Sequence, residues 1–325
     1  LLILTYVAFE YSYDDMHSRQ DRIFRVEARF YENGELTDDW ASSSAGYATA
    51  MKQNMSAVEA YTRVGSQYYP EQVVKYNELL YRETGIGYAE ANFFDFFDFK
   101  LLKGNKESCL DGPNKVVITE RIARKYFKGA DPIGKILIFR SNIGEEACEV
   151  TGIMEDMPIN THIRYNLLIS YKTLPKWMDE YWYRHEVYSY VLLKSANLKT
   201  QVEEDFPVMA EKYKTEEALK NKTWAIQLTN LRDIHLNPQK AYEPEVKGNR
   251  SSIWVLICTA LAILCIAWIN YINMTVARSM ERYTSGFGGK PEAGYFTVPF
   301  RIVGDEQYCF YPGYRADGGV DAFFQ

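Results

Sequence analysis

The residues best suited to chemistry lie near the start of the chain, in the stretch EYSYDDMHSRQ. Asp14 and Asp15 stand beside His17, and two carboxylates with an imidazole can bind a metal ion or exchange protons. The same residues could instead mark only the point where the apolar segment 1–9 gives way to chain in water. A metal site would need further ligands from distant positions that no sequence pattern marks, so we favour the last interpretation.

Two other places carry acidic or imidazole groups. Glu155 and Asp156 could form a carboxylate pair, but acidic residues after a strand-like run are typical of solvated turns. His162, in the stretch NTHIRYN, is expected to hydrogen-bond the local backbone rather than to ligate a metal. Neither place is predicted to be catalytic.

Catalytic motifs are absent from the sequence. It holds four histidines and lacks the GxSxG, HExxH and GxxxxGK[ST] patterns of hydrolases, metalloproteases and phosphate-binding loops. The glycine-rich stretch GFGGKPE has no preceding strand and no Ser or Thr at the required place. We therefore predict no catalytic, cofactor-binding or metal-binding residues and no enzymatic activity.

Composition narrows the class of protein. The 325 residues are 47% hydrophobic and 15% aromatic, enough for about two domains with real cores. The net charge of −6 gives no broad basic field, which argues against a nucleic-acid partner. The five cysteines form no CxxC pair and no cluster with histidine at zinc spacing, so a structural zinc is not expected.

A long apolar segment lies late in the chain, in SSIWVLICTALAILCIAWINYINMTVA. Residues 251–277 contain no charged side chain, and a helix needs about 20 apolar residues to cross a bilayer. Trp254, Trp268 and Tyr271 suit the membrane interface, and Asn270 and Asn273 share a face that could hydrogen-bond a neighbouring helix. We predict a transmembrane helix, the alternative being a core helix of a soluble enzyme over residues 253–276.

The roughly 240 residues before this segment have the patterns of a soluble domain. Short strand-like runs outnumber helical patterns and do not alternate strictly with them, so we predict an α+β fold rather than a doubly wound parallel sheet. Helices are predicted over residues 44–55, 119–127 and 198–213, with Thr119 as an N-cap. The predicted strands are IFRVEARF, YTRVGSQYY, EQVVKYN, NKVVIT, GKILIF, CEVTGIM, IRYNLLIS, VYSYVLLK and TWAIQLTN.

The stretch FEYSYDDMHSRQDRIFRV resembles the membrane-exit segment of MacB/FtsX-like ABC transporter permeases of the Bacteroidetes type. Later segments resemble successive parts of the same family in the expected order, over about residues 9–282. They are ANFFDFFDFKLLKGN, GPNKVVITERIARKYFKGADPIGKIL, VTGIMEDMPINTHIRYNLLIS, LTNLRDIHL and INYINMTVARSMER.

The resemblance implies an α+β extracytoplasmic domain flanked by transmembrane helices. Residues 1–9 would be the end of a truncated first transmembrane helix, residues 10–250 a MacB-type periplasmic core domain, residues 251–278 the second transmembrane helix and residues 279–325 a tail. Tyr11 and Tyr13 would lie in the aromatic belt of the interface. Asp21 and Arg22 would fix how the stalk joins the first strand.

The implied function is that of a permease subunit in an efflux or mechanotransmission transporter, in a bacterial cytoplasmic membrane with several passes. ATP would be hydrolysed by a separate cytoplasmic subunit. The implied partners are that ATP-binding subunit, a second permease in a homodimer or heterodimer, membrane lipid and a periplasmic adaptor. A membrane-bound sensor is the alternative, because it also places an extracytoplasmic domain between two helices.

The same topology would expose Cys109 and Cys148 to an oxidising compartment, where a disulfide between them is an open alternative. The tail departs from the family, which places a basic stretch and two further spans after a segment like ARSMER. With permitted codons, residues 296–315 read one nucleotide later give LQFRFESLAMNSIAFILAIV, and residues 284–291 read two nucleotides later begin VGIRRQA. We therefore predict that the chain from Tyr283 onward is a reading-frame artefact without a packed core.

Overall fold

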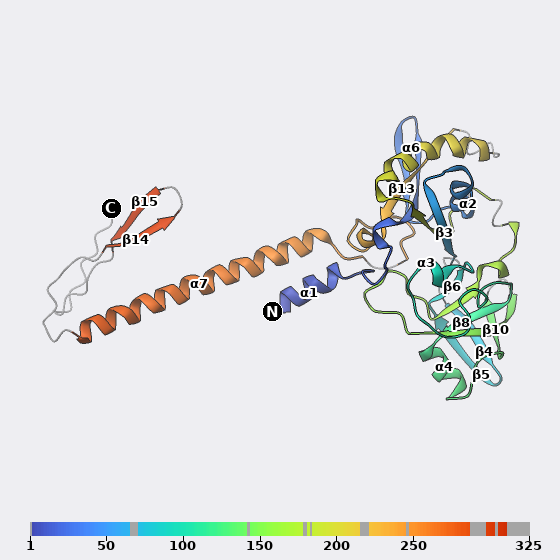
Figure 1. The fold of residues 1–325 in the computed structure, drawn as a ribbon, viewed down its shortest axis with the longest axis horizontal. Coiled ribbons are helices and arrows are strands. Elements are labelled where there is room, and N and C mark those ends of the chain that lie inside the picture. Colours follow the sequence, from blue (N-terminus) through green and yellow to red (C-terminus); the bar gives the residue numbers. More distant parts are fainter. Residues whose placement is uncertain are drawn as a thin grey trace. The chain divides into compact units, whose positions relative to one another are not determined.

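The computed structural model describes residues 2–65, 71–141, 144–177, 181–182, 184–214, 221–244, 247–286, 297–302 and 305–310. The chain divides into two compact units, Leu1–Ile257 and Cys258–Gln325. Figure 1 labels the main elements of both units. The helices are α1 (Leu2–Tyr11), α2 (Ala45–Asn54), α3 (Phe93–Phe96), α4 (Glu120–Phe127), α6 (Lys199–Ala210) and α7 (Arg250–Gly286). The strands are β1 (Ile23–Glu32), β2 (Glu35–Trp40), β3 (Val58–Gly65), β4 (Glu71–Tyr76), β5 (Leu79–Thr84), β6 (Ile86–Ala89), β7 (Leu101–Lys103), β8 (Lys115–Thr119), β9 (Ile136–Ser141), β10 (Gly144–Met154), β11 (Leu167–Ser170), β12 (Val187–Leu193), β13 (Thr223–Asn230), β14 (Thr297–Ile302) and β15 (Asp305–Phe310).

The first unit is built on one continuous hydrogen-bonded sheet. Its strand order is β13-β1-β12-β3-β6-β11-β8-β10-β9-β4-β5, with β2 paired to β1 and β7 paired to β10. Most neighbours are antiparallel, and the pairs β6–β11 and β8–β10 are parallel. The predicted α+β class is confirmed, and each predicted strand run contains a strand.

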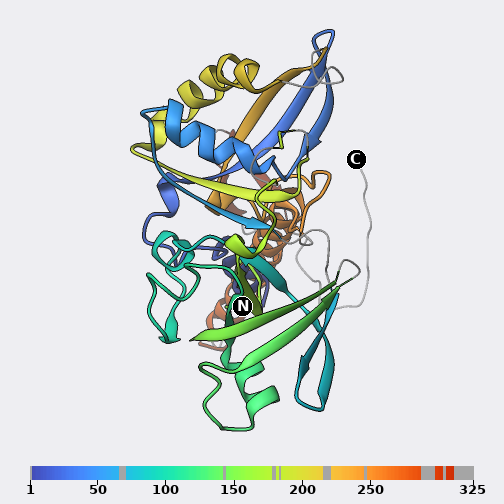
Figure 2. The same cartoon turned by 90° about the vertical axis from the view of Figure 1, so that its right-hand side faces the viewer.

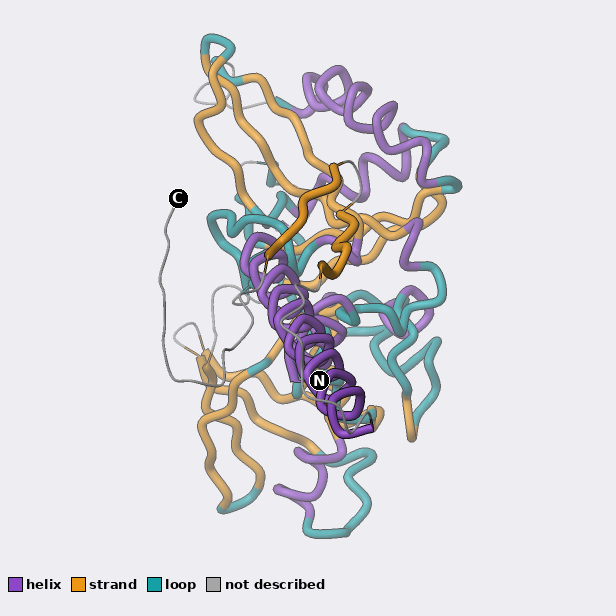
Figure 3. Tube along the Cα trace, turned by 90° about the vertical axis from the view of Figure 1, so that its left-hand side faces the viewer, coloured by secondary structure: helices purple, strands orange, loops and turns teal. Residues whose placement is uncertain are grey.

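The sheet carries two lobes. The first lobe consists of β1, β12 and β13 with α2 and α6, and the second lobe of β4, β5, β8, β9 and β10 with α4 (Figure 2). In the first lobe the strands lie on one side and the helices on the other (Figure 3). Its core joins alternate residues of β1, including Phe24 and Phe30, to Tyr47 of α2, Phe206 of α6 and Trp224 of β13. Strand alternation thus directs one face of β1 to the helices.

Helix α4 shows how the local sequence sets the second lobe. The Thr119 hydroxyl accepts a hydrogen bond from the Ile122 amide at 3.4 Å, which is the predicted N-cap. Ile122, Tyr126 and Phe127 are buried against the sheet. The helix ends where Lys128 adopts a left-handed φ of 49°.

A third core cluster joins the two lobes. It centres on the phenylalanines of the stretch ANFFDFFDF, in and after α3, and includes Cys109. Cys148 belongs instead to the core of the second lobe. Both thiols are free and buried, and burial raises the pKa of Cys109 to about 11 and that of Cys148 to about 12. The alternative of a disulfide between them is therefore not realised.

Helix α7 is long enough and apolar enough to cross a membrane over Arg250–Ser279. It is the only such helix among the described residues. Only 6% of its apolar window is buried, so it is not a core helix of the soluble kind. Trp254, Trp268 and Tyr271 are exposed on it.

Beyond α7, the described part of the tail is a single antiparallel hairpin of β14 and β15. The helix itself continues to Gly286, past the predicted end at residue 278. Residues 287–296, 303–304 and 311–325 of the predicted frame artefact lie outside the described residues. The artefact stays a prediction.

Candidate functional site at the base of the domain

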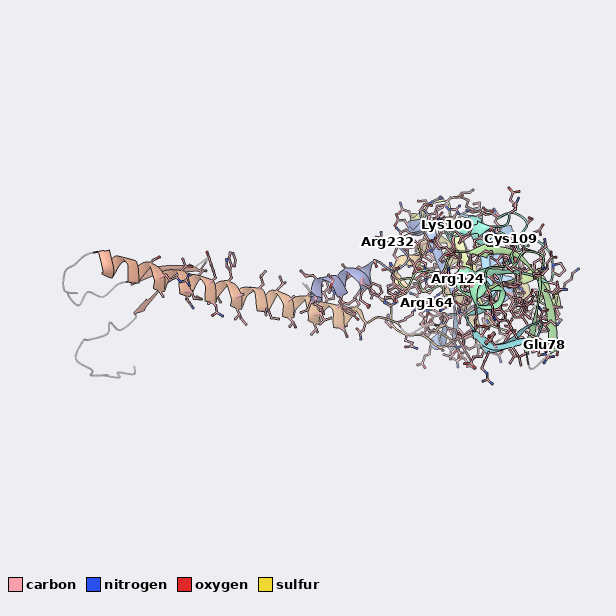
Figure 4. All side chains as sticks on the ribbon, turned by 90° about the horizontal axis from the view of Figure 1, so that it is seen from below. Glu78, Lys100, Cys109, Arg124, Arg164 and Arg232 are labelled. Atoms are coloured by element: carbon pink, nitrogen blue, oxygen red, sulfur yellow. The ribbon has the colours of Figure 1, made fainter. Side chains whose placement is uncertain are left out.

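The two ends of the first unit meet at one place, which we call the base. It consists of residues 10–22, at and after the end of α1, of residues 160–164, and of residues 232–244 and 247–250, which lead into α7. Figure 4 shows Arg164 and Arg232 toward the side of the unit where α1 joins it, with Glu78 on the far side. The candidate site is this junction.

Glu10 makes the most direct link between the two ends. Its Oε2 atom lies 2.9 Å from His235 Nε2, and both side chains are buried. The ring of Tyr13 stacks on His235 with 3.4 Å between centroids and 3° between planes. Gly248 packs so closely that a Cβ there would lie 2.5 Å from Glu10 Oε2 and 2.8 Å from His235 Nε2. Only glycine leaves room for this contact.

A second carboxylate–histidine pair lies beside the first. Asp14 is fully buried with a left-handed φ of 59°, which aspartate tolerates better than most residues. Its Oδ2 atom lies 2.7 Å from His162 Nδ1, and Thr161 Oγ1 donates to its Oδ1 at 2.5 Å. His162 Nε2 lies 2.9 Å from the Tyr190 hydroxyl on β12. Burial would raise the pKa of Asp14, but the charge and hydrogen bond of His162 hold it below its usual value.

His17 faces a different partner. Its Nδ1 atom accepts a hydrogen bond from the Asp98 amide at 3.1 Å, which requires an unprotonated Nδ1. Ser18 N donates to Asp98 Oδ2 at 2.5 Å and closes the same loop. Burial lowers the pKa of His17 to about 4. This histidine is therefore a neutral structural residue.

Exposed ion pairs surround these buried groups. Arg232 pairs with Asp15 at 3.1 Å and with Asp21 at 3.4 Å. Arg22 pairs with Glu59 at 2.7 Å and donates to the Leu193 carbonyl at 3.1 Å. Asp21 and Arg22 thus tie the stalk to the sheet just before β1, as predicted.

The chain that leads into α7 is held by a buried ionic cluster. On the face of β1 opposite its apolar face, Arg25 pairs with Glu27 at 2.6 Å and with Glu243 at 2.6 Å. Lys247 pairs with Glu243 at 2.6 Å, and Lys240 with Glu27 at 2.8 Å.

These charges are paired and largely buried. The side chains of Arg25, Glu27 and Glu243 are 0%, 1% and 2% exposed. Burial would raise the pKa of Glu27, but Arg25 and Lys240 lower it below its usual value. Burial also lowers the pKa of Lys247, against the attraction of Glu243. Every charge has an opposite partner, which makes such a cluster tolerable in an interior.

The structure separates the three residues singled out at the start of the sequence. Asp14 turns to His162, Asp15 to Arg232, and His17 to the Asp98 amide, and no group of three metal-ligating side chains occurs among the described residues. Asp14 and His17 are buried and Asp15 is exposed, so the expected entry into water holds for Asp15 and is wrong for Asp14 and His17.

Two further expectations are wrong. The ring of His162 does not hydrogen-bond the local backbone. It hydrogen-bonds the side chains of Asp14 and Tyr190, which lie in distant segments of the chain. Tyr13 is buried against His235 and does not face an interface, whereas Tyr11 is exposed. Glu155 and Asp156 are exposed, and Asp156 Oδ1 accepts from the Arg121 amide at 3.1 Å at the start of α4, which fits the predicted turn.

Sequence reasoning missed Arg25, Glu27, His235, Glu243 and Gly248. The alternation in IFRVEARF would place Arg25 and Glu27 on a solvated face of β1. Lys240, Glu243 and Lys247 lie on that face instead, and no local pattern predicts this. The one available signal was His235, which lies in the quoted segment LTNLRDIHL.

The central polar contacts at the base are buried. Asp14, His162 and Tyr190 form a hydrogen-bonded chain, and all three side chains are buried. These contacts hold three segments, which are distant from one another in sequence, in one arrangement.

Comparison with known proteins agrees with the fold. No curated protein matches the sequence. A domain assigned to a permease protein from Porphyromonas gingivalis is 23% identical, with a TM-score of 0.59 over 71% of this chain and 96% of that one. The extracellular domain of the ABC-type transporter YknZ from Gram-positive bacteria is 13% identical, with a TM-score of 0.41 over 63% of this chain and 100% of that one. The periplasmic region of MacB from Actinobacillus actinomycetemcomitans is 14% identical, with a TM-score of 0.42 over 70% and 94%.

The family is decided by sequence rather than by these likenesses, of which only the first is strong enough to support the fold. A family model described as the MacB-like periplasmic core domain matches residues 1–207, more than half of the 325 residues. The chain therefore belongs to the MacB-like periplasmic core domain family of ABC-type transporter permeases.

Proposed function

We propose that this chain is part of a permease subunit of an ABC-type efflux or mechanotransmission transporter. Residues 1–9, of which 2–9 lie in α1, and residues 251–278, within α7, are its first and second transmembrane segments. Residues 10–250 form the extracytoplasmic domain, and the whole protein crosses the bacterial cytoplasmic membrane several times. The apolar sequence of both segments and the sparse burial of α7 support this topology.

One observation carries the mechanical role. Glu10, next to the end of α1, bonds His235 and packs on Gly248, which lies two residues before α7. The buried cluster of Arg25 and Glu243 ties the same approach to β1. A displacement of either helix is therefore transmitted to the sheet through these contacts. Packed cores and buried ion pairs have discrete arrangements, so the contacts move together rather than deforming one by one.

The energy source and the partners follow from this role. The chain supplies no phosphate-binding loop, so ATP is hydrolysed by a separate cytoplasmic ATP-binding subunit. The permease works as a homodimer or as a heterodimer with a second permease, in contact with membrane lipid and with a periplasmic adaptor. The tail 279–325 is the product of a shifted frame from Tyr283, which resequencing of the gene tests.

Topology is tested by thiol labelling of whole cells. A Leu80→Cys variant places a thiol on β5, where the native side chain is 53% exposed. Cys258, Cys265 and Cys309 are replaced by Ser, and the buried Cys109 and Cys148 stay as an internal blank because their raised pKa values slow reaction. An impermeant maleimide should label Leu80→Cys from outside, and labelling only after lysis contradicts the topology.

Partnership is tested by purifying the full-length protein from membranes. We expect a cytoplasmic ATP-binding subunit to co-purify with it and to hydrolyse ATP in the complex. A signalling kinase in its place, with no ATP-binding subunit bound, favours the sensor alternative and contradicts the transporter.

A further inference from the structure

The short loop Met157-Pro158-Ile159-Asn160 exposes an aliphatic side chain. Ile159 is 69% exposed. A single exposed apolar residue is ordinary on a protein surface and carries no meaning by itself. The position of this one is what matters.

The loop is pinned to the end of α1. Asn160 Nδ2 donates to the Ser12 carbonyl and to Ser12 Oγ, both at 3.0 Å, and Asp14 N donates to the Asn160 carbonyl at 3.0 Å. Ser12 directly follows α1, and its amide donates to the Phe9 carbonyl at 3.0 Å. The backbone next to Ile159 therefore lies at the level where the apolar helix ends.

The loop is also held from its other side. Thr161 donates to the buried Asp14, and the Arg164 guanidinium donates to the Ile159 carbonyl and, at 3.4 Å, to the Tyr13 hydroxyl. Pro158 restricts the backbone before Ile159. Because the loop is tied on both sides, it cannot fold back to cover Ile159 without breaking the contacts of Asp14.

We propose that residues 157–160 form a membrane-contacting loop, in which Ile159 enters the interfacial layer of the lipid bilayer beside α1. The proposal rests on the proposed function, which places α1 in the membrane. The exposed Tyr11, at the end of α1, and the exposed Arg164 then lie at headgroup level, where aromatic rings and arginine side chains are favoured. The extracytoplasmic domain thereby rests on the membrane at a third point besides its two helices.

Fluorescence depth measurement tests the proposal in the full chain. An Ile159→Cys variant, in the background lacking Cys258, Cys265 and Cys309, is labelled with an environment-sensitive dye and reconstituted in phosphatidylcholine vesicles. We expect blue-shifted emission and strong quenching by lipids that carry a nitroxide near the headgroup. A Pro158→Cys variant gives a second probe of the same loop, and a dye at Leu80→Cys should be quenched by aqueous iodide and not by the nitroxide lipid.

A dye at Leu4→Cys, on α1, tests the placement of α1 in the membrane separately from the loop contact. Quenching by nitroxide lipid at Leu4 but at neither loop position overturns the loop contact and leaves the membrane topology standing. Absence of quenching at Leu4 as well overturns the placement of α1 and the loop contact together.

Discussion

Charged residues are used differently in the two lobes of the sheet. In the second lobe, the pair of Arg82 and Glu71 lies at the surface, with side chains 75% and 49% exposed, and the buried Glu83 pairs with Lys125, which is 36% exposed. In the first lobe, Arg25 and Glu27 are almost completely buried and hold the segment that leads to α7. Surface ion pairs add little to the free energy of unfolding, whereas removing one partner of a buried pair lowers it strongly. Buried charge is therefore placed where a distant segment must stay in one position.

The largest expected effect comes from breaking this buried cluster. Arg25→Ala leaves Glu27 and Glu243 buried without their main partner, and we expect the free energy of unfolding to fall by about 3–5 kcal/mol. Chemical denaturation of the purified chain, followed by tryptophan fluorescence, measures the change. Arg82→Ala is the matched control and should stay within about 0.5 kcal/mol of the wild type. Equal losses in the two variants would remove the contrast between the lobes.

The next effect is a dependence of stability on pH that belongs to His17. The pKa of this histidine is about 4 in the folded chain, against about 6.5 when unfolded. As the pH falls from about 6.5 to about 4, the unfolded state takes up the proton first, so stability is full above this window and declines through it. A shift of this size corresponds to about 3 kcal/mol.

His17→Gln isolates this contribution, since a glutamine carbonyl can still accept from the Asp98 amide. Its unfolding free energy should vary less than that of the wild type between pH 6.5 and 4. Asp14 acts in a separate window: its lowered pKa adds stability above its unfolded value near 4, which is lost as the pH falls further through the folded value. Parallel pH profiles for the wild type and His17→Gln would contradict the assignment to His17.

A smaller effect is expected at the contact between the two ends of the domain. In Gly248→Ala the new methyl group must displace the Glu10 carboxylate or the His235 ring, and we expect a loss of about 1–3 kcal/mol. Gly65→Ala is the matched control, because a Cβ there would meet Leu174 Cδ1 at an ordinary 3.7 Å. Thermal unfolding of both variants measures the difference, and a Gly248→Ala variant as stable as Gly65→Ala argues against close packing at the base.

Local sequence predicted the elements well and the junction poorly, for one physical reason. The cap of α4 at Thr119 and the strand in NKVVIT depend on neighbours in the chain, and both are confirmed. The pair of Glu10 and His235 joins residues 225 positions apart, and that of Arg25 and Glu243 joins residues 218 apart. Such pairs depend on the path of the sheet, which periodicity does not contain.

The central claim is that the segments following α1 and preceding α7 are held as one unit at the base. Hydrogen–deuterium exchange of the full chain tests it most directly, in the wild type and in Asp14→Asn. This substitution directly weakens only the contacts between residues 10–17 and residues 160–164. We expect faster exchange in residues 232–250 as well as in those two segments, with Arg82→Ala unchanged at all three. Faster exchange confined to residues 10–17 and 160–164 would show that the two ends open independently, and would contradict the claim.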